Sequence, residues 1–244
     1  MTVFEDVAAE RDVPLYRHGI DWSYDVLPDR LVLHTPHNIY DLPKPNLVGD
    51  HQYGNAATAA MTLLTIGDRH PALSLPLSAY EYGMTHASWM GRLQKLTGGS
   101  FHGPLVDRLP PSIELWIDGG HNDSCGLVLG AQADRWAAED GKPLHVILGM
   151  LNTKNPTEFA RYLLPKAASV QAITIPDQPL SLSAEALGEA LGEALGGISH
   201  VPAASSVEEA VAHILAHAGD TPCRILITGS LYLMGHILQE NAQA

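Results

Sequence analysis

The chain has 244 residues, 45% of them apolar, so it can bury one large core, or one core and part of a second. Its 27 acidic residues outnumber its 14 basic ones, and the resulting net charge of −13 disfavours nucleic acid and anionic membranes as partners. Cys125 and Cys223 are isolated in the sequence, and we interpret the histidines as ordinary surface or hydrogen-bonded residues and not as metal ligands. We therefore expect a cytoplasmic protein with reduced thiols and no metal ligands of its own.

The first third of the chain mixes short strand-like segments with one helix. Strands are predicted at 13–16, 23–27 and 31–35, with a hairpin turn at Asp29. The segment NAATAAMTLLTI predicts a buried helix over 55–66 that ends at Gly67. Residues 71–91 show no strong period, and we place a domain junction near Gly83 to Gly91, taking 1–83 and 84–244 as the domains.

From there on, predicted strands and helices alternate. The strands fall at 113–117, 145–148, 170–175 and 224–228, and helices at 126–138, 156–168, 183–195 and 231–239, with a further helix after Ser206. Asn155 and Ser206 stand where side-chain caps begin two of these helices. The alternation predicts an α/β fold with a doubly wound, Rossmann-like, mostly parallel sheet.

Two segments place polar groups where strands of such a sheet end, which is where ligands bind. In WIDGGHND, residues 116–123, Asp118 ends a strand and His121 precedes a helix; this carboxylate suits a ribose diol, or it only caps a turn. In ITGSLYLMG, residues 227–235, Ser230 holds a small polar ligand or simply caps the next helix. The motifs Gly-x-Ser-x-Gly and Gly-x-Gly-x-x-Gly are absent, which disfavours an esterase and a nicotinamide dehydrogenase.

Four segments in order carry a family resemblance: LVGDHQYGNAATAA at 47–60, WMGRLQ at 89–94, DGGHND at 118–123 and ITGSLYLMG at 227–235. Together they resemble the carboxyl-terminal half of folylpolyglutamate and dihydrofolate synthases in the Mur ligase family. The resemblance runs from about residue 47 to the end. It implies that 1–83 is the end of the central P-loop ATPase domain, and that 84–244 is the Mur ligase C-terminal domain.

The resemblance also implies roles for five residues. Asn55 would lie at adenine, Arg92 would reach the nucleotide phosphates, and Asp118 would bind the ribose. His121 and Ser230 would lie near the acyl phosphate and the incoming glutamate. Ordinary roles stay open beside these, since Arg92 could be a solvated surface residue and Asn55 could cap its helix.

Two departures from the family pattern stand out. Gly120 and Asp123 occupy positions that are usually Ala and Pro, although Asp in a first helical turn is favourable. The phosphate-cradling motif Gly-x-x-x-x-Gly-Lys-Ser/Thr is absent from the sequence. We expect that motif, the Mg ligands and most of the pterin site to precede Met1, so that this chain is a truncated part with little or no activity alone.

The implied function is that of an ATP-dependent ligase. It adds L-glutamate to a folate or dihydropteroate carboxylate through an acyl phosphate, with ATP and Mg as cofactors. Two alternatives remain: a noncatalytic module of the same fold that binds a nucleotide or a partner, and half of a peptidoglycan-precursor Mur ligase. Apolar surface on a truncated ATPase domain could also drive self-association.

Overall fold

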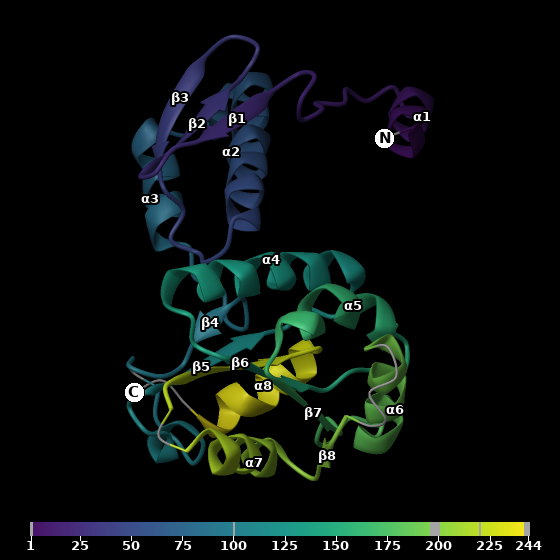
Figure 1. The fold of residues 1–244 in the computed structure, drawn as a ribbon. Coiled ribbons are helices and arrows are strands. Elements are labelled where there is room, and N and C mark those ends of the chain that lie inside the picture. The colour runs from purple at the N-terminus through teal and green to yellow at the C-terminus, as the bar shows by residue number, and fades with distance from the viewer. Residues whose placement is uncertain (1, 100, 196–200, 220, 242–244) are drawn as a thin grey trace. The chain divides into compact units, whose positions relative to one another are not determined.

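The computed structural model describes residues 2–99, 101–195, 201–219 and 221–241. The chain divides into two compact units, residues 1–88 and 89–244 (Figure 1). Helix α3 (Leu77–His86) belongs to the first unit, and the division after Ser88 lies within residues 83–91.

A three-stranded antiparallel sheet forms the centre of the first unit, in the order β1-β2-β3. Its strands are β1 (Ser23–Val26), β2 (Arg30–His34) and β3 (Ile39–Pro43). The strands predicted at 23–27 and 31–35 are confirmed, and so is the hairpin turn between them. The strand predicted at 13–16 is wrong, because those residues form no strand, and β3 was missed.

The helices of this unit are α1 (Thr2–Glu10), α2 (His51–Arg69) and α3. Helix α2 packs its buried side chains against inward residues of the sheet such as Leu31 and Leu33. Gly67 was predicted to end this helix but lies buried inside it. A Cβ there would stand 3.1 Å from the Cα of Ser74, so the glycine lets the chain after α2 pass close by.

The second unit contains a six-stranded sheet in the order β4-β5-β9-β6-β7-β8. Only β4 runs antiparallel to its neighbour, β5. The predicted mostly parallel sheet is therefore confirmed. The strands are β4 (Gln94–Lys95), β5 (Ile113–Asp118), β6 (Leu144–Leu148), β7 (Ser169–Ile173), β8 (Ala203–Ala204) and β9 (Cys223–Thr228).

Helices cover both faces of this sheet, as a doubly wound fold requires (Figure 1). Those that follow the strands are α4 (Asp123–Asp140), α5 (Pro156–Leu163), α6 (Ala184–Ala194), α7 (Val207–Ala218) and α8 (Leu231–Glu240). The helix after Asn155 ends at Leu163 and not near residue 168. Only a 3-10 turn, Leu164–Lys166, continues it, because Pro165 has no N–H to donate.

Alternate residues of each strand enter two separate cores. Val146 and Leu148 pack with α4, α5 and α6, whereas Ile147 and Ile173 pack with α7 and α8. This alternation follows from the period of two along a strand. None of the helices in the described part of the chain is long and apolar enough to cross a membrane.

Candidate functional site

The carboxyl ends of three parallel strands meet at one edge of the second unit's sheet. Asp118 of β5 and Leu148 of β6 both pair with Thr228 of β9. The Thr228 hydroxyl donates to the Gly120 carbonyl over 3.4 Å. The two segments that the sequence singled out, 116–123 and 227–235, therefore lie side by side.

Asp118 is buried and holds two backbone segments together. Its Oδ2 accepts a hydrogen bond from the Leu93 amide at 2.7 Å, and its Oδ1 accepts one from the Gly120 amide at 2.7 Å. The carboxylate thus ties the 91–93 turn to the turn that follows β5. Asp118 therefore caps the turn that follows β5, which was one of the two predicted alternatives. Its role in binding a ribose stays a prediction.

The Gly91–Arg92–Leu93 turn runs alongside the end of β5. The Gly119 amide donates to the Gly91 carbonyl over 2.8 Å, and both Gly91 and Leu93 have positive φ, 70° and 39°. Positive φ is unfavourable for leucine, and this leucine is also fully buried. Backbone strain of this kind persists only where the surroundings fix it, and it is concentrated at functional sites.

This turn directs Arg92 over the strand end. The guanidinium Nη1 lies 3.4 Å from where a Cβ on Gly119 would stand. Arg92 is half-buried, and within the described residues it makes no hydrogen bond or ion pair. A guanidinium in that position retains its donors for an anion.

The two glycines after Asp118 allow this close packing. A Cβ on Gly120 would stand 2.8 Å from Asp118 Oδ1 and 2.8 Å from the Cβ of Cys125, and one on Gly119 would collide with the Leu231 side chain. The glycine at position 120, where the family pattern usually has Ala, thus fits its neighbours here.

His121 has a defined tautomer when neutral. Its Nδ1 lies 2.9 Å from the Gly119 carbonyl, which can only accept, so Nδ1 carries the proton and Nε2 the lone pair. The next residue, Asn122, caps α4 by accepting from the Cys125 amide at 2.9 Å. His121 therefore stands just before a helix N-terminus, where negative charge is stabilised.

Ser230 is fully buried and caps α8, since its Oγ accepts from the Tyr232 amide at 3.1 Å. Its ordinary role as a helix cap is confirmed, and the predicted contact with the reacting groups stays a prediction. The turn before it depends on Gly229, whose φ is 107° and where a Cβ would stand 2.5 Å from the Gly149 carbonyl oxygen.

Asn55 lies in the first unit, within α2, and its side chain is exposed. Its amide Nδ2 donates to Gln52 Oε1 over 3.0 Å, and residue Asp50 takes the N-cap position of this helix. The suggestion that Asn55 caps its helix is therefore wrong. Its convergence with Arg92 and Asp118 on one nucleotide stays a prediction.

Sequence reasoning missed several residues that shape the site. Gln94 accepts from the Gly91 amide at 2.8 Å, Leu93 takes the strained conformation, and Thr228 joins β9 to Gly120. Nothing in the order of these residue types signals a strained leucine. Among the described residues, no group of three or more His, Cys, Asp or Glu side chains could hold a metal ion.

Comparison with known proteins places this geometry in context. No family model matches the chain. In sequence it is 29% identical to a folylpolyglutamate synthase of Lacticaseibacillus casei and 25% identical to a "Probable dihydrofolate synthetase" of Schizosaccharomyces pombe, over 82% and 84% of this chain. The matched regions are 40% and 46% of those proteins, so the chain spans about half the length of the curated relatives that it matches.

Solved structures agree on the fold. E. coli FolC in complex with DHPP and ADP superposes with a TM-score of 0.75 at 23% identity, over 98% of this chain and 50% of that one. A Mycobacterium tuberculosis folylpolyglutamate synthase complexed with ADP and AMPPCP gives a TM-score of 0.71 at 22% identity. The chain is thus similar in sequence to folylpolyglutamate and dihydrofolate synthases, and has the fold of about half of such an enzyme.

Proposed function

We propose that this chain forms part of an ATP-dependent ligase that joins L-glutamate to the carboxylate of a folate or dihydropteroate. One observation supports it most: Arg92, without a partner among the described residues, lies against Gly119 beside Asp118 at the carboxyl edge of a parallel sheet. Phosphate and sugar groups of nucleotides bind at such edges. The two curated relatives and several of the similar structures carry names that fit this chemistry.

The proposed reaction has two steps. A carboxylate oxygen of the acceptor substrate attacks the terminal phosphorus of ATP, and ADP leaves with the electrons of the broken bond. The glutamate amine then attacks the acyl carbon, the C–N bond forms, and phosphate leaves. Activation is needed because a free carboxylate is a poor electrophile, and the protein contributes mainly positioning and charge stabilisation.

Each residue of the site has a proposed part in this scheme. Arg92 offers its planar fork to phosphate oxygens, and Asp118 accepts from the ribose hydroxyls. The Nε2 lone pair of His121 takes the proton that the glutamate amine loses. Ser230 keeps the start of α8 in place next to the reacting groups, and Asn55 contacts adenine.

ATP-dependent ligation of this kind takes a divalent cation to offset phosphate charge. The described residues offer no cluster for one, and the sequence has no phosphate-cradling Gly-x-x-x-x-Gly-Lys-Ser/Thr motif. We therefore assign no step through Mg to these residues. Its ligands are proposed to belong to a part of the enzyme that this sequence does not contain.

The proposal predicts little or no ligation by this chain alone. Purified protein incubated with ATP, Mg, glutamate and dihydropteroate or tetrahydrofolate should release almost no ADP above the background rate. Robust glutamate ligation would contradict the assignment of the missing motif to another segment. In a full-length relative, replacing the histidine that corresponds to His121 by Ala should lower turnover, and unchanged turnover would remove it from the scheme.

A noncatalytic module with the same fold is the second candidate, and the missing phosphate motif favours it. Calorimetric titration with ATP and with glutamate separates the two, because a module that has lost the role binds neither. The sequence relatives are named as folate-related synthases, so a peptidoglycan-precursor ligase has less support.

We further propose a cytoplasmic location, no nucleic acid or membrane partner, and self-association through apolar side chains of the first unit, such as Leu73 and Tyr82.

A further inference from the structure

Gln94 closes the turn that carries Arg92. Its side-chain Oε1 accepts a hydrogen bond from the Gly91 amide over 2.8 Å, so the side chain reaches back across the turn to the residue before Arg92. Gln94 is the first residue of β4, the edge strand, and it pairs there with Ile117 near the end of β5. The bond therefore ties one end of the turn to the sheet.

A second side chain holds the other end of the same turn. The Leu93 amide, directly after Arg92, donates to Asp118 Oδ2 over 2.7 Å. Arg92 therefore lies between two backbone amides that are each bound by a side chain. Asp118 already has a proposed contact with the ribose, whereas the bond from Gly91 to Gln94 acts on the turn itself.

The turn depends on the Gln94 acceptor for its shape. Gly91 and Leu93 both have positive φ, and for leucine such a conformation persists only where the surroundings impose it. Gly91 is also buried, and a buried N–H that loses its acceptor is costly. Without Gln94 the turn would rearrange to find another acceptor, which the freedom of a glycine permits. The guanidinium of Arg92 would move with it.

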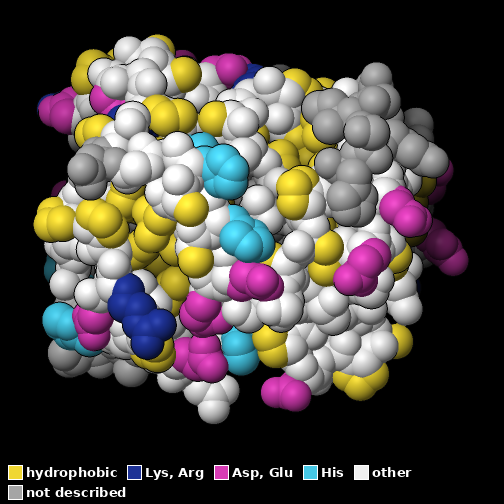
Figure 2. Space-filling model, turned by 60° about the horizontal axis from the view of Figure 1, so that its bottom comes forward, with side chains coloured by type: hydrophobic (Ala, Val, Ile, Leu, Met, Phe, Trp, Pro, Cys, Tyr) yellow, Lys and Arg dark blue, Asp and Glu magenta, His cyan; other side chains and the backbone are white. Residues whose placement is uncertain are grey.

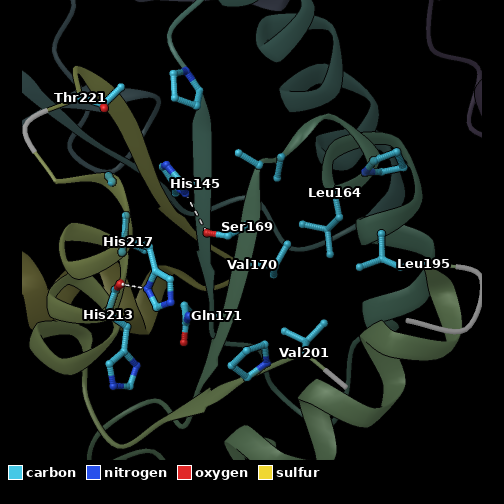
Figure 3. A pocket seen from close by; sticks show the side chains of 17 residues that line it. His145, Leu164, Ser169, Val170, Gln171, Leu195, Val201, His213, His217 and Thr221 are labelled. Carbon is cyan, nitrogen blue, oxygen red and sulfur yellow. Dashed lines mark hydrogen bonds between the residues drawn. The ribbon is translucent and has the colours of Figure 1, made fainter. Parts of the chain in front are cut away.

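Hydrogen bonds of other side chains in this unit brace regular elements instead. His145 Nδ1 lies 2.7 Å from the Ser169 hydroxyl and joins β6 to β7, which already pair there (Figure 3). His217 Nδ1 donates to the His213 carbonyl over 2.7 Å, within α7. Figure 2 shows histidines interspersed with acidic and hydrophobic side chains on one face of the molecule. The bond to Gln94 differs from these, because it holds an irregular turn around a half-buried cation.

We propose that Gln94 is a positioning residue for phosphate binding, and that it acts by holding the turn in the conformation that directs Arg92 over the carboxyl end of β5. The inference rests on the proposed function, since it assumes that Arg92 binds the phosphates of a nucleotide. A protein whose turn adopts this conformation only part of the time binds the nucleotide more weakly by that fraction. Loss of the Gln94 acceptor should therefore weaken nucleotide binding as well as the fold.

A matched pair of variants separates these two effects. Gln94→Leu removes the acceptor at nearly the same volume. Thr97 Oγ1 accepts from the Leu115 amide over 3.0 Å, so Thr97→Val removes the same kind of bond beside the same two strands but away from Arg92. Titration of ¹⁵N-labelled protein with ADP should show about threefold to tenfold weaker binding in Gln94→Leu, the effect of one lost hydrogen bond on the population of the turn. Thr97→Val should bind ADP like the unmodified protein, although urea unfolding shows a similar loss of stability in both variants.

Two additions keep the test sharp if Gln94→Leu folds poorly. Gln94→Asn has an amide that is one methylene too short for the bond, and it should weaken ADP binding in the same way. Hydrogen exchange needs no ligand: the Gly91 amide should be protected in the unmodified protein and in Thr97→Val, and should lose protection in Gln94→Asn.

The outcomes distinguish this inference from the proposed function. Unchanged ADP affinity in the Gln94 variants, an equal loss in Thr97→Val, or a Gly91 amide that exchanges as fast as that of the exposed Gly99 would overturn the positioning role alone. Absence of ADP binding to the unmodified protein would overturn the proposed function, and this inference with it.

Discussion

Two arginines at opposite ends of the same pair of strands have opposite environments. Arg224, near the amino end of β9, is almost fully buried, donates to Glu114 at 2.8 Å and to Asp140 at 2.9 Å, and lies 4.8 Å from the Trp136 ring centre. Arg92, at the carboxyl end of β5, has no such partner among the described residues. The first arginine completes a network and the second leaves its donors available.

The two environments distinguish Arg224, which stabilises the fold, from Arg92, which we propose binds a ligand. A buried arginine needs carboxylates, because an unpaired charge in a protein interior is very costly. A half-buried arginine at the carboxyl ends of the strands, where ligands bind, needs no carboxylate partner before an anionic ligand binds. The predictions below test this separation, starting from the largest expected effect.

Replacing Arg224 by Ala should lower the free energy of unfolding by about 2–3 kcal/mol, because it removes a buried guanidinium that packs on Trp136 and bonds Glu114 and Asp140, although Glu114 keeps Lys142 and Lys95. Urea unfolding followed by circular dichroism measures this. Arg108→Ala, at an exposed position, is the control and should change stability by less than about 0.5 kcal/mol. Equal effects of the two variants would show that the Arg224 network does not support the fold.

Acid should weaken the same network. Burial alone would raise the pKa of Glu114, but hydrogen bonds from Lys142 and Arg224 hold it well below its usual range. The hydrogen bond from Arg224 lowers the pKa of Asp140 to about 2. Because both pKa values are depressed in the folded state, their stabilisation is present above the unfolded carboxylate pKa of about 4 and is lost as pH falls toward about 2.

Urea midpoints measured across that pH range should therefore fall steeply, and Glu114→Gln combined with Asp140→Asn should flatten the curve. An acid dependence that is the same in this double variant would place the titrating groups elsewhere.

Gly120→Ala should destabilise the second unit by about 1–3 kcal/mol, since the new Cβ would press on Asp118 Oδ1 and on Cys125. Gly235→Ala, in α8, meets no atom within 4 Å and should be neutral or slightly stabilising. Thermal unfolding of the two variants makes the comparison. If Gly120→Ala is as stable as Gly235→Ala, the close packing after Asp118 is not a constraint.

Arg92→Gln should have the smallest effect on stability, within about 0.5 kcal/mol, because the described residues form no bond with this side chain that folding would lose. Urea unfolding beside Arg224→Ala makes the contrast direct. A loss approaching that of Arg224→Ala would mean that Arg92 also serves the fold.

The sequence predicted most of the second unit because its signals are local. Strand β5 ends at a polar residue, and Asn155, Pro156 and Ser206 mark helix starts that the structure reproduces. The first unit was predicted less well. Strand β3 contains Asp41 and ends at Pro43, and α3 lacks a strong apolar period, so neither pattern stands out before tertiary packing is known.

The candidate site shows the same limit. The motifs identified Asp118 and His121, but the strained Leu93 and the hydrogen bond that its amide donates to Asp118 depend on segments 25 residues apart coming together.

Titration of ¹⁵N-labelled protein with ADP tests the central claim most directly, since it asks whether the Arg92 edge of the sheet binds a nucleotide. We predict amide shifts at 91–93 and 119–121 in the unmodified protein, and their loss in Arg92→Gln at unchanged stability. No shifts at these residues with millimolar ADP, or the same shifts in Arg92→Gln, would contradict it.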